Sequence, residues 1–320
     1  MKRIFPIDDH LKLPSGDTML DIRVRGTSES NPVVLFLLGG PGACNRHAVL
    51  KDQAPLADAC TIVCLDQRGA GKSYNASQAK RKLNMEIAVE DVRCVVDYLC
   101  ERFHCEKVFV VGHSYGSYLG VLFAARYPEK VAAYVGIGQL ANGAENERIS
   151  YEFVLNEAQK RNDQKALKDL ARIGWPKNGI YASLDDLMVQ RNYMTKYGGA
   201  AHGKKEGLIT SLVLPVLRSP EYTLFDLVRY AKGSFYNMHQ LWEEVISCDF
   251  IKDVPKLDVP VFLTIGRHDG NTPPELAKEW FDALAAPKKE WIWFEESAHS
   301  PLSEETERWN SVIRERLLGK

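Results

Sequence analysis

The chain has 320 residues, of which 45% are hydrophobic, and its 41 lysines and arginines against 42 aspartates and glutamates give a formal net charge of −1. This composition is that of a globular protein with a large core, and it excludes an intrinsically disordered chain. The balanced charge produces no overall field that would attract nucleic acid or an anionic membrane surface, so we expect a small-molecule partner.

The first residues and the cysteines indicate the compartment. Met1–Asp9 lacks the apolar core of a signal peptide, and no apolar run is long enough to span a bilayer, which predicts a cytoplasmic protein that does not bind membranes. The seven cysteines form no disulfide framework, and the sequence contains no Cys-x-x-Cys or His-x-x-x-His pair. We therefore expect buried thiols, no metal and no other cofactor.

Strands and helices alternate along most of the chain. Thr18–Arg25 alternates apolar and polar residues, which is typical of a half-exposed strand in a hairpin. Six later runs are largely apolar and predict a parallel sheet covered by helices on both faces: Val33–Leu37, Thr61–Leu65, Lys107–Val111, Val131–Val135, Pro260–Ile265 and Trp291–Phe294. The predicted fold class is therefore α/β, with the hairpin at one edge of a mostly parallel sheet.

Between Gln139 and about Pro255 the pattern changes to long helical stretches, such as Gln164–Ile173, without a strand. We interpret residues 139–255 as a helical cap inserted into a core domain of residues 1–138 and 256–320. The glycine-rich loop Lys196–Lys205 lies within this cap. This loop could gate the substrate pocket, but we favour a flexible surface loop without a function.

The segment Val108–Ser117 carries the most informative motif. It is an apolar run that ends in Gly-x-Ser-x-Gly at residues 112–116, between a predicted strand and the predicted helix Tyr118–Arg126. A sharp strand-to-helix turn of this kind lifts its central side chain clear of the sheet and crowds the backbone on both sides, which favours the two glycines. Ser114 is therefore the predicted nucleophile.

An acid and a histidine follow Ser114 along the chain. Asp269 comes just after the run Pro260–Ile265, at the sheet edge where ligand-facing residues collect, and His299 follows the last apolar run. A serine hydroxyl is a weak nucleophile at neutral pH, but an imidazole can take its proton and a carboxylate can fix the imidazole tautomer. The order predicts a catalytic triad of Ser114, Asp269 and His299. The simpler alternatives are a buried turn serine, a surface aspartate and a capping histidine.

Backbone amides near these residues are candidates for an oxyanion hole. The glycine-rich loop at residues 38–42 follows the run Val33–Leu37, and its glycines let the backbone approach a substrate closely. Tyr115 directly follows Ser114 at the start of a helix, where amide groups point outward. We assign the oxyanion hole to the amides of Gly40 and Tyr115.

Other polar features have simpler interpretations. The Gly-Lys-Ser at residues 71–73 lacks the first glycine of a P-loop because Asp66 stands there, so we expect no nucleotide. Arg68 could brace neighbouring loops or bind a substrate anion, and we favour the bracing role. His113 and His268 adjoin the predicted nucleophile and acid, and we expect them to be packing residues.

Together these segments resemble the α/β-hydrolase superfamily and, within it, the proline iminopeptidase branch. Residues 38–42 are similar to that branch's His-Gly-Gly-Pro-Gly loop, and residues 66–73 to its Asp-Gln-Arg-Gly-x-Gly-x-Ser segment. The contexts of Ser114, Asp269 and His299 supply the rest. The resemblance implies an α/β-hydrolase fold with an inserted helical cap, and a serine peptidase acting on a short peptide.

The resemblance also bears on how the substrate is held. Leu38 stands where the branch usually has histidine, so an imidazole that would brace the oxyanion loop is missing. Peptidases of this branch look to hold the substrate's free amino group with acidic residues from the cap. This implies such a role for Glu145 and Glu147, with Glu243 and Glu244 also available.

We therefore expect a serine hydrolase that cleaves a small amide, peptide or ester bond through an acyl-enzyme on Ser114. The resemblance favours an aminopeptidase similar to proline iminopeptidases. A carboxylesterase-like hydrolase of small esters is the alternative, favoured by Leu38 and by an aromatic-rich cap. A non-catalytic ligand-binding homologue is a further alternative, which the complete triad disfavours. The sequence leaves the acyl group, the leaving group and the oligomeric state open.

Overall fold

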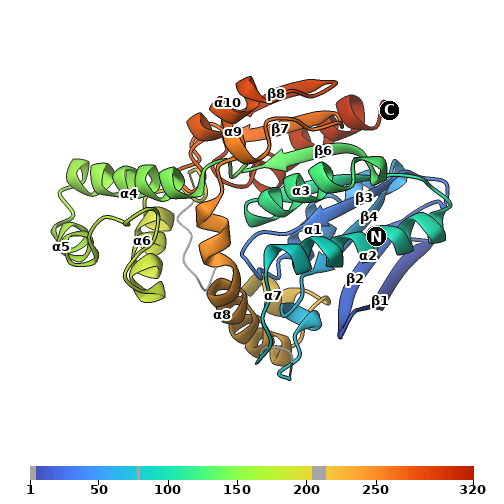
Figure 1. Ribbon diagram of the computed structural model, residues 1–320, viewed down its shortest axis with the longest axis horizontal. Helices are drawn as coiled ribbons and strands as arrows, with labels where there is room; N and C mark the ends of the chain where they lie inside the picture. The colour runs from blue at the N-terminus through green and yellow to red at the C-terminus, as the bar shows by residue number, and fades with distance from the viewer. Residues whose placement is uncertain (1–4, 78–79, 204–213) are drawn as a thin grey trace.

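The computed structural model describes residues 5–77, 80–203 and 214–320. Its centre is an eight-stranded sheet in the order β1-β2-β4-β3-β5-β6-β7-β8 (Figure 1). Pairing is antiparallel from β1 to β2 and from β2 to β4, and parallel across the rest of the sheet. The strands are β1 (Ile7–Ser15), β2 (Thr18–Gly26), β3 (Val33–Leu37), β4 (Thr61–Asp66), β5 (Val108–His113), β6 (Val131–Ile137), β7 (Val261–Gly266) and β8 (Lys289–Phe294).

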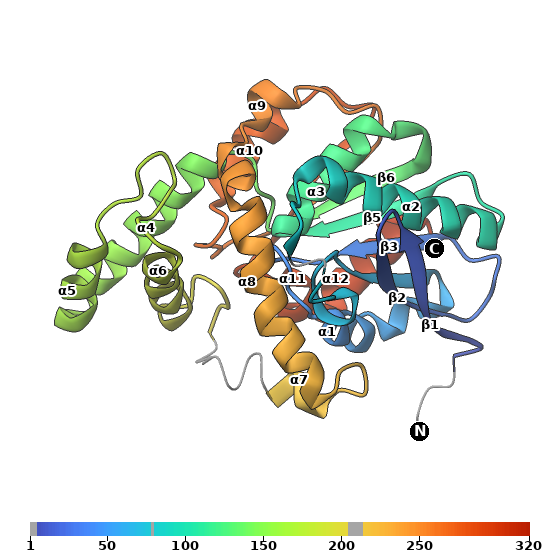
Figure 2. The same cartoon turned by 60° about the horizontal axis from the view of Figure 1, so that its bottom comes forward.

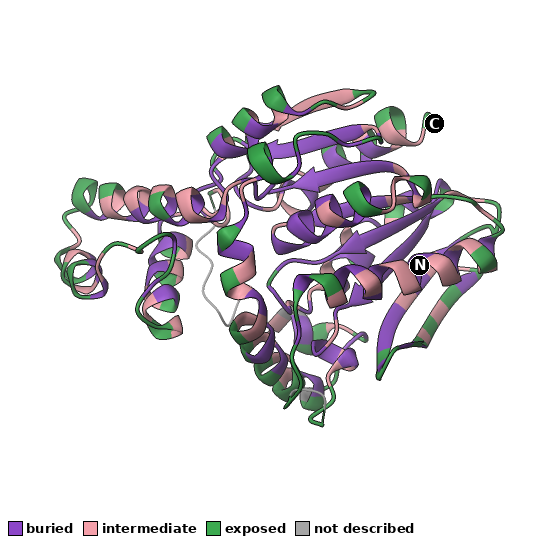
Figure 3. Cartoon of the chain, viewed as in Figure 1, coloured by how far each residue is buried: buried purple, intermediate pink, exposed green. Residues whose placement is uncertain are grey.

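The sheet confirms the predicted α/β class. Each apolar run is a strand whose ends differ from the prediction by at most two residues, and the hairpin forms the antiparallel edge. Strands β3, β4 and β7 are buried along their whole length because helices cover both of their faces. Figure 3 shows this burial running through the middle of the sheet.

Two helical layers enclose the sheet. Leu35 of β3 belongs to an apolar cluster with Val92 and Trp280 on one face, whereas Phe36 packs with Leu50 and Trp309 on the other. Neighbouring residues of a strand point to opposite faces, so one strand supplies both clusters. The core helices are α1 (Arg46–Asp52), α2 (Met85–Phe103), α3 (Tyr115–Arg126), α10 (Pro274–Ala283), α11 (Pro301–Glu304) and α12 (Thr306–Val312), with shorter helical turns at Ala54–Asp58, Gly71–Ser73, Pro128–Lys130 and Ile313–Leu317.

The described residues between β6 and β7 form helices and no strand: α4 (Gly143–Lys160), α5 (Gln164–Ile173), α6 (Leu184–Lys196), α7 (Leu214–Arg218), α8 (Leu224–Ser247) and α9 (Phe250–Asp253). Helices α4, α5 and α6 share an apolar cluster and stand to one side of the sheet, with α8 between them and the core (Figures 1 and 2). The glycine-rich loop begins at the end of α6, and its last residues, Lys204 and Lys205, lie outside the described residues. None of the described helices combines the length and the apolar character needed to cross a bilayer.

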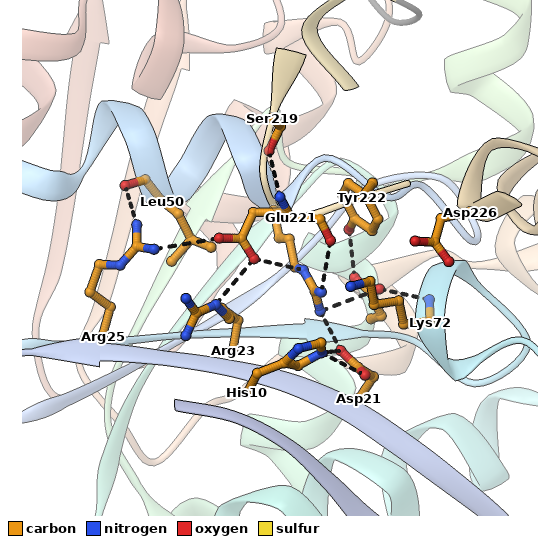
Figure 4. Close-up of polar contacts among 12 residues, drawn as sticks. His10, Asp21, Arg23, Arg25, Leu50, Lys72, Ser219, Glu221, Tyr222 and Asp226 are labelled. Atoms are coloured by element: carbon orange, nitrogen blue, oxygen red, sulfur yellow. Dashed lines mark hydrogen bonds and ion pairs between the residues drawn. The ribbon is translucent and has the colours of Figure 1, made fainter. Parts of the chain in front are cut away.

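A group of buried charges, here called the Arg46 cluster, joins the sheet to the segment before α8. The fully buried Arg46 places Nη1 at 2.5 Å from Asp21 Oδ1 and 3.4 Å from Asp66 Oδ2. Its Nε lies 3.6 Å from Glu221 Oε2, and the Tyr222 hydroxyl donates to Asp66 Oδ1 at 2.8 Å (Figure 4). Burial raises the pKa of Asp66, and the Arg46 guanidinium opposes that rise. Arg46 is therefore the guanidinium that Asp21 and Asp66 share, whereas Glu221 also pairs with Arg23 at 3.2 Å and with Arg25 at 3.4 Å.

Candidate active site

Ser114 lies at the sharp turn between β5 and α3, as its motif predicts. Its backbone has φ 56° and ψ −124°, a strained conformation for a residue with a side chain. A Cβ on Gly116 would fall 2.0 Å from the Leu37 carbonyl oxygen, so only glycine lets the helix start this close to β3. The Ser114 amide donates to the Ile137 carbonyl at 2.9 Å, which ties the turn to the end of β6.

Asp269 and His299 are joined by a hydrogen bond. Asp269 follows β7, His299 follows β8, and Asp269 Oδ2 lies 2.9 Å from His299 Nδ1, with both side chains buried. The other carboxylate oxygen accepts from the amides of Asn271 and Thr272 at 2.9 and 2.8 Å. A carboxylate held this way orients the imidazole with the proton on Nδ1 and leaves Nε2 free to take a proton.

His299 lies beside the Ser114 turn. A Cβ on Gly138, the residue after Ile137, would fall 2.8 Å from His299 Nδ1, and the His113 and His299 rings have centroids 4.9 Å apart. The hydrogen bonds between described residues do not include one from Ser114 Oγ to His299 Nε2. The structure therefore brings the predicted nucleophile, acid and base together, but the hydrogen bond between Ser114 and His299 is not formed. This bond is often long in substrate-free sites.

Gln67 braces the predicted oxyanion loop. Its Nε2 donates to the Leu38 carbonyl at 2.7 Å, and its Oε1 accepts from the Gly42 amide at 3.1 Å, so one side chain spans the loop. Gly40 has φ 123°, a conformation that a residue with a Cβ rarely adopts. Gln67 therefore holds the loop between Leu38 and Gly42, a role that no local sequence pattern revealed.

A cavity of about 240 Å³ opens in front of Ser114. Gly40 and Tyr115 line it from the core, and the side chains of α4, α6 and α8 close the opposite wall. The Tyr115 amide is the first of α3 and therefore has no acceptor within the helix. Both predicted oxyanion donors thus border the same space as Ser114.

Of the two acids predicted to hold the substrate, Glu147 reaches this cavity. It is 1% exposed, and its Oε1 accepts from Arg191 Nη2 at 2.5 Å and from Asn146 Nδ2 at 3.3 Å. Its Oε2 is buried and has no hydrogen-bond partner among the described residues. Glu145 instead pairs with Arg148 at 2.6 Å, is 40% exposed and does not line the cavity. The structure therefore separates the two glutamates.

Two residues near the acid and base have roles that sequence reasoning missed. The buried Thr272 hydroxyl donates to Asp269 Oδ2 at 2.7 Å and lies 3.1 Å from His299 Nδ1. His113, expected to be a packing residue, has its Nε2 3.0 Å from the His299 carbonyl oxygen. Burial, with the nearby His299, lowers the pKa of His113 to about 3, so its ring is a neutral hydrogen-bond donor to that carbonyl.

Arg68 has a bracing role in the structure. Its guanidinium makes two 2.7 Å bonds to the Asp91 carboxylate and further bonds to Asp17 and to the Ser15 carbonyl. These contacts join the loop after β4 to α2 and to the β1–β2 hairpin. Arg68 is therefore occupied by the protein itself, as predicted.

The described part of the chain contains no group of three or more His, Cys, Asp or Glu side chains placed to hold a metal ion. The seven cysteines are free thiols. Burial raises the pKa of Cys60 and of Cys248 to about 12, which keeps both thiols protonated and unreactive at neutral pH.

Comparisons with known proteins agree with the observed fold. A family model described as the alpha/beta hydrolase fold matches residues 32–173. A probable aminopeptidase of Bacillus subtilis (strain 168), YbaC, is 30% identical over 297 residues, which cover 92% of this chain and 91% of that protein. A proline iminopeptidase of Clostridium botulinum is 24% identical over 91% of each chain. Among solved structures, a proline iminopeptidase of Mycobacterium smegmatis has a TM-score of 0.65 at 18% identity and covers 97% of this chain and 98% of that one.

Proposed function

The chain belongs to the α/β-hydrolase family and is a hydrolase of small substrates, and from this premise we propose that it is a serine aminopeptidase that removes the first residue of a short peptide. The observation that carries the proposal is Glu147, a buried carboxylate that lines the same cavity as Ser114 and whose Oε2 has no hydrogen-bond partner among the described residues. A carboxylate oxygen of this kind is suited to an ammonium group. The relatives named as an aminopeptidase and a proline iminopeptidase support the same activity.

The proposed reaction begins with attack by Ser114 Oγ on the carbonyl carbon of the substrate's first residue. His299 Nε2 takes the hydroxyl proton, while Asp269 holds the Nδ1 proton and stabilises the imidazolium. The amides of Gly40 and Tyr115 donate to the tetrahedral oxyanion. His299 then gives its proton to the leaving amine, and the carbon–nitrogen bond breaks to leave an acyl-enzyme on Ser114.

Water completes the cycle. His299 removes a proton from a water molecule that attacks the acyl carbon, and the same oxyanion donors stabilise the second tetrahedral intermediate. Collapse of this intermediate returns the proton to Ser114 Oγ and releases the free amino acid. Each proton moves between His299 and a neighbouring oxygen or nitrogen, so no metal or cofactor enters the proposed cycle.

We further propose that residues 139–255 act as the cap that defines the substrate, and that residues 1–138 and 256–320 form the core that carries the triad. The cap supplies Glu147 and Arg191 to the cavity, and α8 supplies an apolar wall that includes Trp242. The free thiols support a reducing compartment such as the cytoplasm as the place of action. The proposed partner is a short peptide or a small amide, not nucleic acid.

One observation favours a second candidate, a hydrolase of small carboxylic esters. Leu38 puts a buried aliphatic side chain at the head of the oxyanion loop, and the cavity wall includes apolar side chains from α6 and α8. An ester has a better leaving group than an amide, so it demands less of the acid and base. The free amino group separates the candidates, because only the aminopeptidase requires it.

Replacing Glu147 by glutamine tests the proposed amine contact. We expect kcat/KM for alanine or proline 4-nitroanilide to fall by about 10- to 100-fold, since a hydrogen bond to a charged group contributes about 1.5–3 kcal/mol. Hydrolysis of the N-acetylated substrates, which lack the ammonium group, is expected to stay at its wild-type level. Initial rates for both substrate sets, with melting curves to verify folding, measure the effect.

The matched control is Glu145→Gln, which removes the same charge two residues away on the exposed side of α4. It is expected to leave both rates within about twofold of wild type. Equal losses on free and acetylated substrates in Glu147→Gln would mean that Glu147 supports the fold of the cavity and does not recognise an amine.

Replacing Thr272 by valine tests the hydroxyl that contacts the acid and base. We expect kcat to fall by about threefold to tenfold, the equivalent of one ordinary hydrogen bond, because the Asp269 carboxylate and the His299 ring lose a shared partner. Thr272→Ser keeps the hydroxyl and should retain most of the activity. A valine variant with wild-type kcat would assign Thr272 to packing alone.

A further inference from the structure

Glu304 binds the backbone on both sides of the proposed base. Its Oε2 accepts from the Ala298 amide at 3.1 Å, and its Oε1 accepts from the Ser300 amide at 2.8 Å. These are the two residues that flank His299. The Ser300 amide belongs to the peptide unit that directly follows His299, and the Ala298 amide lies in the unit before the one that precedes it. The Glu304 carboxylate therefore holds the backbone segment from which the His299 imidazole extends.

The same carboxylate holds a segment of the proposed cap. Glu304 Oε2 also accepts from the His202 amide at 2.7 Å. His202 belongs to residues 198–203, here called the cap segment, which follows α6. The Glu304 carboxylate therefore accepts hydrogen bonds both from the loop that carries His299 and from the cap segment.

The cap segment also reaches the loop that carries the acid. The Gly270 amide, next to Asp269, donates to the Gly199 carbonyl at 3.0 Å. The His202 ring stacks on the His268 ring with centroids 3.7 Å apart and planes 8° from parallel. The cap segment is thus hydrogen-bonded to the acid loop directly and to the base loop through Glu304.

From these contacts we propose that Glu304 is a positioning residue for His299, and that it makes the alignment of the base depend on the docking of the cap segment. The inference rests on the proposed roles of Ser114, Asp269 and His299. Misplacing a reacting group by about 1 Å can cost about 100-fold in rate. Loss of the carboxylate frees two amides beside the base at once, whereas loss of the His202 amide removes one of the contacts that orient the carboxylate.

The first experiment compares Glu304→Ala and Glu304→Gln with Glu307→Ala, which removes an exposed carboxylate three residues further on. For Glu304→Ala we expect kcat to fall by about 10- to 100-fold with KM within about threefold of wild type, because the substrate contacts are untouched. The rate of covalent labelling by a fluorophosphonate should fall in the same proportion. Glutamine keeps one acceptor oxygen and is expected to recover part of the loss, while Glu307→Ala stays at wild-type rates.

The second experiment removes the His202 amide proton. His202→Pro lacks the N–H donor, whereas His202→Ala keeps it and loses only the ring, so the ratio of their kcat values isolates the hydrogen bond to Glu304. We expect the proline variant to be about threefold to tenfold slower than the alanine variant. In a Glu304→Ala background this ratio should return to about one, since both changes act on the same contact.

The outcomes distinguish this inference from the proposed function. If the fluorophosphonate labels Ser114 in the wild type and labels Glu304→Ala equally fast, the positioning role is wrong and the proposed function stands. If Glu304→Ala does not fold, a proline-to-alanine ratio near one at position 202 would overturn the coupling to the cap segment. A wild-type protein that is not labelled at Ser114 would overturn the proposed function itself.

Discussion

Ser114→Ala is expected to lower kcat by about 10⁴- to 10⁶-fold, the largest effect of any single substitution in the proposed site. The substitution removes the atom that forms the acyl-enzyme, and His299 then has no hydroxyl to deprotonate. The remaining rate would come from water attack assisted by the oxyanion amides. Initial rates on 4-nitroanilide and 4-nitrophenyl ester substrates at high enzyme concentration measure it.

The fold should not change in this variant. Alanine and serine both carry a Cβ, so the strained φ of 56° is the same in either. The melting temperature is therefore expected to stay within about 2 °C of wild type. Covalent labelling by a fluorophosphonate should disappear, and labelling of the alanine variant at the wild-type rate would place the nucleophile elsewhere.

Arg46→Met is expected to cost about 3–5 kcal/mol of unfolding free energy, the largest loss of stability among the predictions. Arg46 and its partners Asp21 and Asp66 are each fully buried. Methionine fills most of the volume of the side chain, but it leaves the buried carboxylates of Asp21 and Asp66 without the guanidinium that they share. Equilibrium unfolding in urea, monitored by circular dichroism and fluorescence, measures the difference.

The matched control and the pH dependence make this prediction specific. Arg93→Met removes a guanidinium from Glu90 and Asp97 on the exposed side of α2 and should cost less than about 1 kcal/mol. Burial raises the pKa of Asp66, and removing Arg46 removes the charge that opposes the rise. In Arg46→Met, Asp66 therefore holds a proton more tightly in the folded state than in the unfolded state. A group of this kind lowers the free energy of unfolding as pH rises, so the loss relative to wild type should be larger at pH 8 than at pH 5. Wild-type stability at pH 8 would contradict the account of the cluster.

The fold could be predicted from the sequence because its strands carry a strong local signal. Runs such as Val33–Leu37 are apolar at every position, and only a sheet covered on both faces buries such a run completely. The Gly-x-Ser-x-Gly turn is equally local, since Gly116 is required by the close approach of α3 to the Leu37 carbonyl. These features need no knowledge of distant contacts.

The choice between Glu145 and Glu147 also had a signal in the sequence. The buried positions of α4 follow a helical stripe that includes Glu147, Tyr151 and Val154, with Glu145 outside it. A glutamate within an otherwise buried stripe is the one that points inward. The rotation of α4, read from its apolar residues, therefore identifies the acid that lines the cavity.

The roles of Gln67, Thr272 and Glu304 could not be predicted in this way. Each acts through hydrogen bonds whose partners lie in other loops, such as the contact between Glu304 and the His202 amide 102 residues away. Polar residues in loops have no periodicity that reveals their direction. Their function depends on how the sheet and the cap segment bring distant parts of the chain together.

The most direct test of the proposed function is to trap the acyl-enzyme. An alanine 4-nitrophenyl ester with a free amino group and its N-acetylated counterpart are each mixed with the protein, quenched in acid within milliseconds to seconds, and mapped by peptide mass spectrometry. The account predicts an added alanyl group on the peptide containing Ser114 with the free-amine ester, and much less acylation with the acetylated ester. Acylation at another residue, or equal acylation of Ser114 by both esters, would contradict an aminopeptidase that acts through Ser114.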